Sequence, residues 1–139
     1  MGCIVGIDFG EKRIGVAVSD SEKKIAFPLD VIHRENNSFG IKKLKSLLGD
    51  RYFDSIVVGV PYRENGKFIN AGHEVFSYID SLKEHFRVPV LPWDERYSTM
   101  IAEQAMISAN VKREGRRGVI DKLAAQIILQ SYLDSHNVS

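Results

Sequence analysis

Residues 3–19 of the chain are CIVGIDFGEKRIGVAVS. The run over residues 3–9 is apolar and rich in β-branched side chains, which predicts a buried strand. Residues 13–19 alternate small and β-branched side chains and predict a second strand. The link over residues 10–12 has the length of a hairpin turn. The segment therefore predicts two neighbouring antiparallel strands.

The rest of the chain predicts further strands and helices. A third strand is expected over residues 24–33, where Pro28 indicates an edge position or a bulge. Short apolar runs then alternate with segments of helical periodicity. We expect strands at 55–60 and 88–93, and helices at 38–48, 75–86, 98–108 and 118–136. This order predicts an α/β fold: one mixed sheet of three antiparallel strands followed by parallel strands, with helices on both faces.

Composition limits the class of protein. The chain has 139 residues, of which 44% are hydrophobic and 27% charged, so we expect a single domain over residues 1–139. The lone cysteine, Cys3, excludes a disulfide framework. The sequence has no apolar run as long as a membrane span and no signal-peptide pattern. We therefore expect a cytoplasmic protein with no membrane partner.

An acidic residue interrupts the first apolar strand. Asp8 follows Ile4 and Gly6 on one face of that strand, because side chains alternate with a period of two. An ionised carboxylate in such a place needs a cation or several hydrogen-bond donors. The alternative is an aspartate in a turn that accepts the backbone N–H of Gly10 or Glu11.

Two further acids follow a later strand. Asp94 and Glu95 come directly after the run 88–93, and acids at the carboxyl end of a strand reach into the ligand crevice of an α/β sheet. The alternative is that they favour the N-terminus of a following helix. The residue types alone leave both interpretations open.

The most informative acid is Asp121, in the last predicted helix. The residues three, four and seven positions later are Ala124, Ala125 and Ile128, so Asp121 shares a face with an apolar stripe. Aspartate is almost never fully buried unless it is paired. The alternative is a solvated aspartate near the start of the helix.

Taken together, the acids suggest a metal site. Converging carboxylates repel one another unless cations neutralise them, and Mg²⁺ prefers oxygen ligands and substrate phosphates. Two such ions about 4 Å apart can hold both the attacking and the leaving oxygen of a phosphodiester displacement. The pattern therefore predicts Mg²⁺, or Mn²⁺, as cofactor.

The motifs around these acids resemble those of the YqgF family. Members of this family are described as pre-16S rRNA nucleases or as Holliday junction resolvase-like proteins, with a ribonuclease H-like fold. Tyr62 and Tyr97 depart from the pattern, where leucine is more common. The matching motifs, in order along the chain, are Ile7–Gly10, Lys12–Asp20, Val58–Pro61, Asn65-Gly66, Asp94–Thr99, Ile120-Asp121 and Ala124-Ala125.

The resemblance implies a metal-dependent nuclease. Asp8, Glu95 and Asp121 would be its catalytic, metal-binding residues, with Asp8 bridging the ions. The implied substrate is the 5′ end of precursor 16S rRNA, and the second possibility is a Holliday junction in branched DNA. Junction resolvases usually act as symmetric dimers. The chain is therefore expected to be a monomer or a homodimer.

Several basic residues are candidates for contacts with nucleic-acid phosphates. The net charge is only +1, yet between residues 112 and 122 five basic side chains accompany only two acidic ones. A solvated turn is the alternative for Lys12 and Arg13, and a salt bridge is the alternative for Arg96. Trp93 either stacks on a base or is a buried aromatic at a strand end. The candidate residues are Lys12, Arg13, Arg96, Lys112, Arg113, Arg116 and Arg117.

Two other classes of protein stay open at this point. The Asp-x-Gly hairpin also occurs in ATP-binding proteins of the actin and hexokinase class, although those close two such domains around the nucleotide. A non-catalytic module that binds nucleic acid is the second rival. A polyanion binder, however, gains nothing from three converging negative charges.

Overall fold

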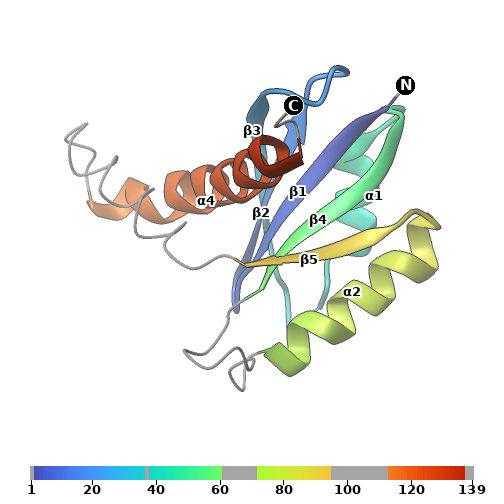
Figure 1. Ribbon diagram of the computed structural model, residues 1–139. Helices are drawn as coiled ribbons and strands as arrows, with labels where there is room; N and C mark the ends of the chain where they lie inside the picture. Colours follow the sequence, from blue (N-terminus) through green and yellow to red (C-terminus); the bar gives the residue numbers. More distant parts are fainter. Residues whose placement is uncertain (1, 37, 61–71, 95–112, 137–139) are drawn as a thin grey trace.

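The structure is a computed structural model that describes residues 2–36, 38–60, 72–94 and 113–136, with backbone alone at 72–73 and 113–122. Figure 1 shows a sheet with helices on both sides. Within the described residues, no helix is long and apolar enough to span a bilayer. The strands are β1 (Cys3–Phe9), β2 (Arg13–Ser19), β3 (Ala26–His33), β4 (Phe53–Val60) and β5 (Val90–Asp94), and the helices are α1 (Ile41–Leu48), α2 (Gly72–Phe86) and α4 (Arg113–His136).

The sheet has the predicted mixed topology. Its strand order is β3-β2-β1-β4-β5, with β1 in the centre. β2 is antiparallel to both β1 and β3, whereas β4 is parallel to both β1 and β5. The carboxyl ends of β1, β4 and β5 therefore lie at one edge of the sheet (Figure 1). The predicted α/β fold is confirmed.

The two faces of the sheet bury different side chains. On one face α1 and α2 cover large aliphatic residues such as Val5 and Ile7, whereas α4 crosses the other face (Figure 1). The α4 side is built from smaller residues, among them Ala17 and Ala125. Because α4 approaches closely, a Cβ atom on Gly6 would lie only 2.6 Å from the Cβ of Leu129. Glycine at position 6 thus sets the distance between helix and sheet.

The third strand starts later than residue 24 because of the turn before it. The Asp20 carboxylate accepts the backbone N–H groups of Lys24 (2.8 Å) and Ile25 (3.0 Å), so these donors do not enter the ladder. The same two hydrogen bonds lower the pKa of Asp20. Both expectations for Pro28 are confirmed: β3 is an edge strand, and its pairing with β2 shifts register next to Pro28.

The last helix begins earlier than predicted. We expected it to start at Gly118, whereas α4 begins at Arg113 and includes Gly115. Glycine costs about 1 kcal/mol in a helix relative to alanine, which argues against a helix without forbidding one. The other boundaries differ by a few residues; α1 begins at Ile41 because Gly40 before it is left-handed, with φ of 62°. The predicted helix at 98–108 lies outside the described residues.

Candidate active site

Asp8 is the predicted site residue that the structure describes best. It lies in the last pair of the β1–β4 ladder and is half-buried, on the face that α4 covers. The preceding residue on this face, Gly6, touches α4 directly. The central strand thus carries a carboxylate to the edge where three strands end.

Glycines flank Asp8 on both neighbouring strands. Its register partner on β2 is Gly15 and its partner on β4 is Gly59. Paired residues of adjacent strands point to the same face, so no side chain of either neighbour stands beside the carboxylate. A glycine inside a strand often marks a place where a ligand or another backbone comes close. Neither glycine was among the predicted site residues, although the register of the hairpin could have revealed Gly15.

One of the two backbone N–H groups that could bond to Asp8 in a turn is already used elsewhere. The backbone N–H of Gly10 donates to the carbonyl oxygen of Arg13 at 2.9 Å and closes the β1–β2 hairpin. Asp8 itself pairs within the sheet rather than in the turn. The turn interpretation then depends on the backbone N–H of Glu11, and the ligand-binding role of Asp8 stays a prediction.

Of the two predicted acids at this strand end, the structure describes Asp94, the last residue of β5. Trp93 shares a row with Gly59 and hence with Asp8, so Asp94, the next residue, belongs to the opposite face. Asp94 is half-buried and closes the strand. Glu95 lies outside the described residues, as does Arg96. Asp94 therefore does not share a face with Asp8.

Asp121 lies well inside α4. It is eight residues after the first residue of the helix, Arg113, whereas the helix dipole acts within the first turn. The interpretation as an aspartate at a helix start is therefore wrong for the backbone position. The predicted apolar stripe is confirmed, since Ala124, Ala125 and Ile128 are fully buried. The side chain of Asp121 lies outside the described part of the structure.

The described side chains do not by themselves form a metal site. Among them, no three acidic, histidine or cysteine residues gather closely enough to hold an ion. Asp8 is the one predicted metal ligand whose side chain is described, and its carboxylate oxygens suit a hard cation such as Mg²⁺. The register partners of Asp8, Gly15 and Gly59, fit the same requirement, because neither of them carries a side chain.

The basic candidates fall into two groups. Lys12 is exposed in the β1–β2 turn, and Arg13 is half-buried at the start of β2 on the face of Asp8. The backbones of Arg113, Arg116 and Arg117 belong to the first turns of α4 rather than to a loop. Lys112 lies outside the described residues. The structure thus places Lys12 and Arg13 next to the Asp8 strand end.

Trp93 packs within the protein. Its indole N–H donates to the Ser131 hydroxyl at 3.1 Å, and its ring centroid lies 5.2 Å from that of Tyr132 in an edge-on arrangement. His136 stacks on Tyr132 at 4.0 Å. These contacts favour the interpretation of Trp93 as a structural aromatic at the strand end.

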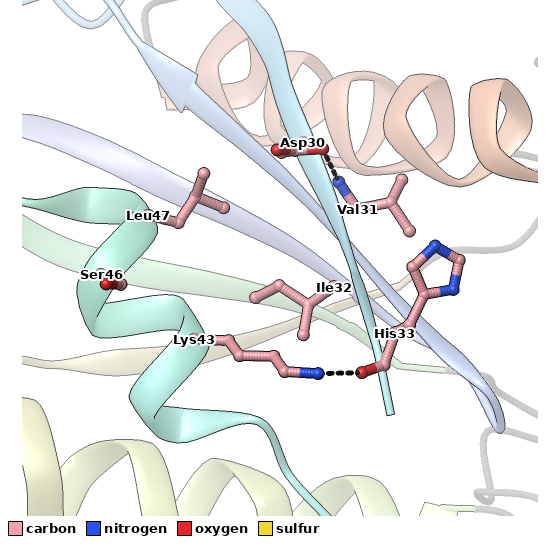
Figure 2. A pocket seen from close by; sticks show the side chains of 7 residues that line it. All are labelled: Asp30, Val31, Ile32, His33, Lys43, Ser46 and Leu47. Carbon is pink, nitrogen blue, oxygen red and sulfur yellow. Dashed lines mark hydrogen bonds between the residues drawn. The ribbon is translucent and has the colours of Figure 1, made fainter. Parts of the chain in front are cut away.

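A surface groove of about 450 Å³ lies away from these residues, between β3 and α1. Figure 2 shows that Lys43 reaches across it to the carbonyl oxygen of His33, at 3.1 Å. The carboxylate of Asp30 accepts the backbone N–H of the next residue, Val31. None of the predicted site residues lines this groove, so it is separate from the Asp8 site.

Comparison with known proteins identifies the family. A family model described as "RuvX: Holliday junction resolvase" matches residues 2–135. A protein of Thermoanaerobacter pseudethanolicus with the provisional name pre-16S rRNA nuclease is 41% identical over 133 residues, covering 95% of this chain and 96% of its own. A relative of the same name from Geobacillus kaustophilus is 44% identical over 133 residues, covering 94% and 96%.

Solved structures show the same fold. Thermus thermophilus RuvC, in complex with a Holliday junction, matches with a TM-score of 0.60 and 14% identity, over 100% of this chain and 99% of RuvC. The Fowlpox virus resolvase, also bound to a Holliday junction, matches with a TM-score of 0.60 and 11% identity, over 98% and 99%. These neighbours confirm the ribonuclease H-like fold, and the match along almost the whole sequence shows that the chain belongs to the RuvX (YqgF) family.

Proposed function

We propose that this protein is a nuclease that hydrolyses phosphodiester bonds in structured nucleic acid at the edge of the sheet where Asp8 lies. The observation that carries the proposal is the Asp8 carboxylate at the end of the central strand, with glycines on both flanks. Membership of the RuvX family supports it independently. The fold neighbours RuvC and Fowlpox resolvase add that such a sheet is compatible with bound nucleic acid.

The proposed catalytic set is Asp8, Glu95 and Asp121. Asp94 faces away from Asp8, which leaves Glu95 as the acid after β5 that fits the family motif. The position of Ala125 against Gly6, one helical turn after Asp121, supports Asp121 as a member of this set. Divalent ions, when bound, supply charge neutralisation and lower the pKa of a bound water.

The chain's own residues have three tasks in this proposal. The carboxylates of Asp8, Glu95 and Asp121 would hold the divalent cations, with Asp8 contributed by the central strand. Lys12 and Arg13 lie at the same strand end and bind phosphates on either side of the cut. We assign Arg96, Lys112, Arg113, Arg116 and Arg117 the same phosphate-binding role, which positions the backbone and carries no sequence information.

Precursor 16S rRNA is the first proposed substrate, because the curated relatives at about 41–44% identity carry that name. A Holliday junction is the second candidate, favoured by the description of the family model. The two substrates make different demands on assembly. A junction has two symmetric strands to cut, and so requires a two-fold dimer.

A parallel cleavage assay tests the proposal. Labelled precursor rRNA, single-stranded RNA and a four-way DNA junction are incubated with the protein, with Mg²⁺, with Mn²⁺ or with a chelator. Asp8→Asn and Asp121→Asn are the inactive variants, and they also expose contaminating nucleases. Asp30→Asn is the matched control, because Asp30 is an exposed aspartate on the edge strand β3.

We expect metal-dependent cleavage by the wild type and by Asp30→Asn, and none by the other two variants. Asp8→Asn should lose more than about a hundredfold in rate, since outer-shell partners of metal ligands are already worth about 10–100-fold. Binding without cleavage in every condition would instead identify a non-catalytic nucleic-acid module. Mass measurement of the active species then separates the monomer from the junction-resolving dimer.

A further inference from the structure

The tip of the β1–β2 hairpin extends past the β1–β4 ladder. That ladder ends at the pair of Asp8 and Gly59, whereas β1 and β2 continue to pair through Phe9 and Ile14. The segment that directly follows Asp8 is therefore paired with β2 alone among the described strands. Its position, and with it the direction of the Asp8 carboxylate, depends on contacts from outside these strands.

One residue supplies these contacts through three hydrogen bonds. Arg34 follows β3, and its backbone N–H donates to the carbonyl oxygen of Lys12 at 2.9 Å. Its Nη1 donates to the carbonyl oxygens of Gly10 and Glu11, each at 2.9 Å. All three consecutive carbonyls of the turn thus accept a hydrogen bond from Arg34.

The same guanidinium is fixed from its other sides. Its Nε donates to the carbonyl oxygen of Ser38 at 2.8 Å, and its Nη1 pairs with the carboxylate of Glu74 in α2 at 2.8 Å. It lies 4.5 Å above the ring of Phe9, the residue after Asp8. The Arg34 side chain is only 1% exposed, whereas that of Glu74 is 49% exposed. The buried guanidinium therefore contacts protein groups and not solvent, and its role is to fix the positions of those groups.

We infer that Arg34 is a positioning residue, which holds the turn and Phe9 in place so that Asp8 keeps the direction its catalytic role requires. The catalytic part of this inference depends on the proposed function. Arginine suits the task because two of its nitrogens donate here, Nε to Ser38 and Nη1 to the turn, whereas lysine has a single nitrogen at its tip. A misplacement of about 1 Å in a catalytic group can cost about a hundredfold in rate.

The first test uses hydrogen exchange, which needs no substrate. In Arg34→Lys, the Gly10 amide, which bonds to the Arg13 carbonyl, should exchange at least about tenfold faster than in the wild type. The Asp20 amide bonds to the carbonyl of Ile25 at 3.0 Å in the other hairpin, and its exchange should not change. Equal exchange of Gly10 in both proteins, or equal acceleration of both amides, overturns the inference.

The second test separates catalysis from binding. Arg34→Lys should lower kcat by about 10- to 100-fold and leave nucleic-acid affinity within about twofold, because Arg34 contacts the protein chain and not the substrate. Arg51→Lys is the matched control, since Arg51 also donates to main-chain carbonyls, those of Leu47 and Leu48 at the end of α1. An unchanged kcat, or an affinity that falls by the same factor as kcat, overturns the inference.

The two tests distinguish this inference from the proposed function. If the wild type cleaves neither RNA nor the junction, the proposed function is wrong, and the exchange rates still decide whether Arg34 holds the turn. If Arg34→Lys does not fold, Phe9→Leu takes its place, because it removes the ring beneath the guanidinium and keeps an apolar side chain. Gly10 exchange should then rise severalfold, and no rise contradicts the inference.

Discussion

The two faces of strand β1 differ in what they contribute. Val5 and Ile7 are fully buried on the face toward α1 and α2, among large aliphatic side chains. The face toward α4 carries Ile4, Gly6 and Asp8. From Ile4 to Asp8 its side chains change from a large aliphatic group to a hydrogen atom and then to a carboxylate. Stability is concentrated on the first face and the candidate chemistry on the second, although both belong to the same seven residues.

This difference shows how one strand serves both purposes. Alternation places neighbours on opposite faces, so a substitution at one residue need not disturb the other. The aliphatic face stabilises the fold, because folding removes its apolar surface from water. The α4 face instead needs glycine, so that helix and sheet approach closely and the register partners of Asp8 carry no side chain.

The largest contrast is expected between the neighbours Ile7 and Asp8. Ile7→Ala should lower the free energy of unfolding by about 2–5 kcal/mol, because it leaves a cavity in the core, while the rate per folded molecule stays near that of the wild type. Asp8→Asn should do the reverse and abolish cleavage with little change in stability. Urea unfolding and single-turnover cleavage of both variants check this. A variant that loses both properties would show that the faces are not independent.

The next contrast concerns the distance between α4 and the sheet. Gly6→Ala places a Cβ atom 2.6 Å from that of Leu129 and 3.2 Å from the carbonyl oxygen of Ala125, so α4 must move. We expect a loss of about 1–3 kcal/mol in stability and slower cleavage, because α4 carries Asp121. Thermal unfolding and kcat measure the two effects. Full activity in Gly6→Ala would argue against a role for α4 in the site.

A smaller effect is expected at Tyr78, on the opposite face. Its ring stacks on Phe9 at 4.4 Å, and its buried hydroxyl has no hydrogen-bond partner among the described residues. Tyr78→Phe should therefore raise the unfolding free energy by about 1 kcal/mol. Denaturant titration at neutral pH checks the sign, and a loss of stability would contradict it.

The buried hydroxyl of Tyr78 should also make the free energy of unfolding depend on pH. Burial raises the pKa of its hydroxyl far above the usual value, and the positive charge of Arg34 opposes this only in part. The unfolded protein therefore releases this proton near pH 10, while the folded protein keeps it. Above about pH 10 stability should fall by up to about 1.4 kcal/mol per pH unit. Tyr78→Phe should lack this component, as unfolding curves between pH 8 and 11 can show.

The smallest effect is expected at Lys12, exposed in the hairpin turn. Lys12→Gln should weaken nucleic-acid binding slightly and reduce the slope of log affinity against log salt by about 0.7–0.9, the share of one phosphate contact. Lys42→Gln, an exposed lysine on α1, is the control. An unchanged slope for Lys12→Gln would remove the turn from the interface.

Local sequence patterns predicted most of the secondary structure. The first two strands have the predicted bounds, because the apolar runs and the short turn between them are both local signals. The start of α4 was wrong, because Gly115 and Gly118 resemble a loop when helix packing is not known. The mixed character of the sheet was predicted from the hairpins and the alternating helices, which are also local features, whereas the strand order β3-β2-β1-β4-β5 comes from the structure.

The candidate site could be predicted only as a set of residue types. The carboxylate at position 8 and the alanine stripe of the last helix are visible in the sequence, since periodicity assigns each to a face. The glycine neighbours of Asp8 depend on register, and the role of Arg34 depends on a turn more than twenty positions earlier in the chain. A lone arginine after a strand carries no local sign of such contacts.

Residue chemistry and spacing alone were thus sufficient for the α/β class, because it depends on short-range periodicity, and the order of the motifs was sufficient for the family. Which side chains stand beside Asp8, how near α4 comes and what holds the hairpin tip were decided by packing. Those features arise from contacts between segments distant in the sequence, and such contacts exist only once the sheet has formed.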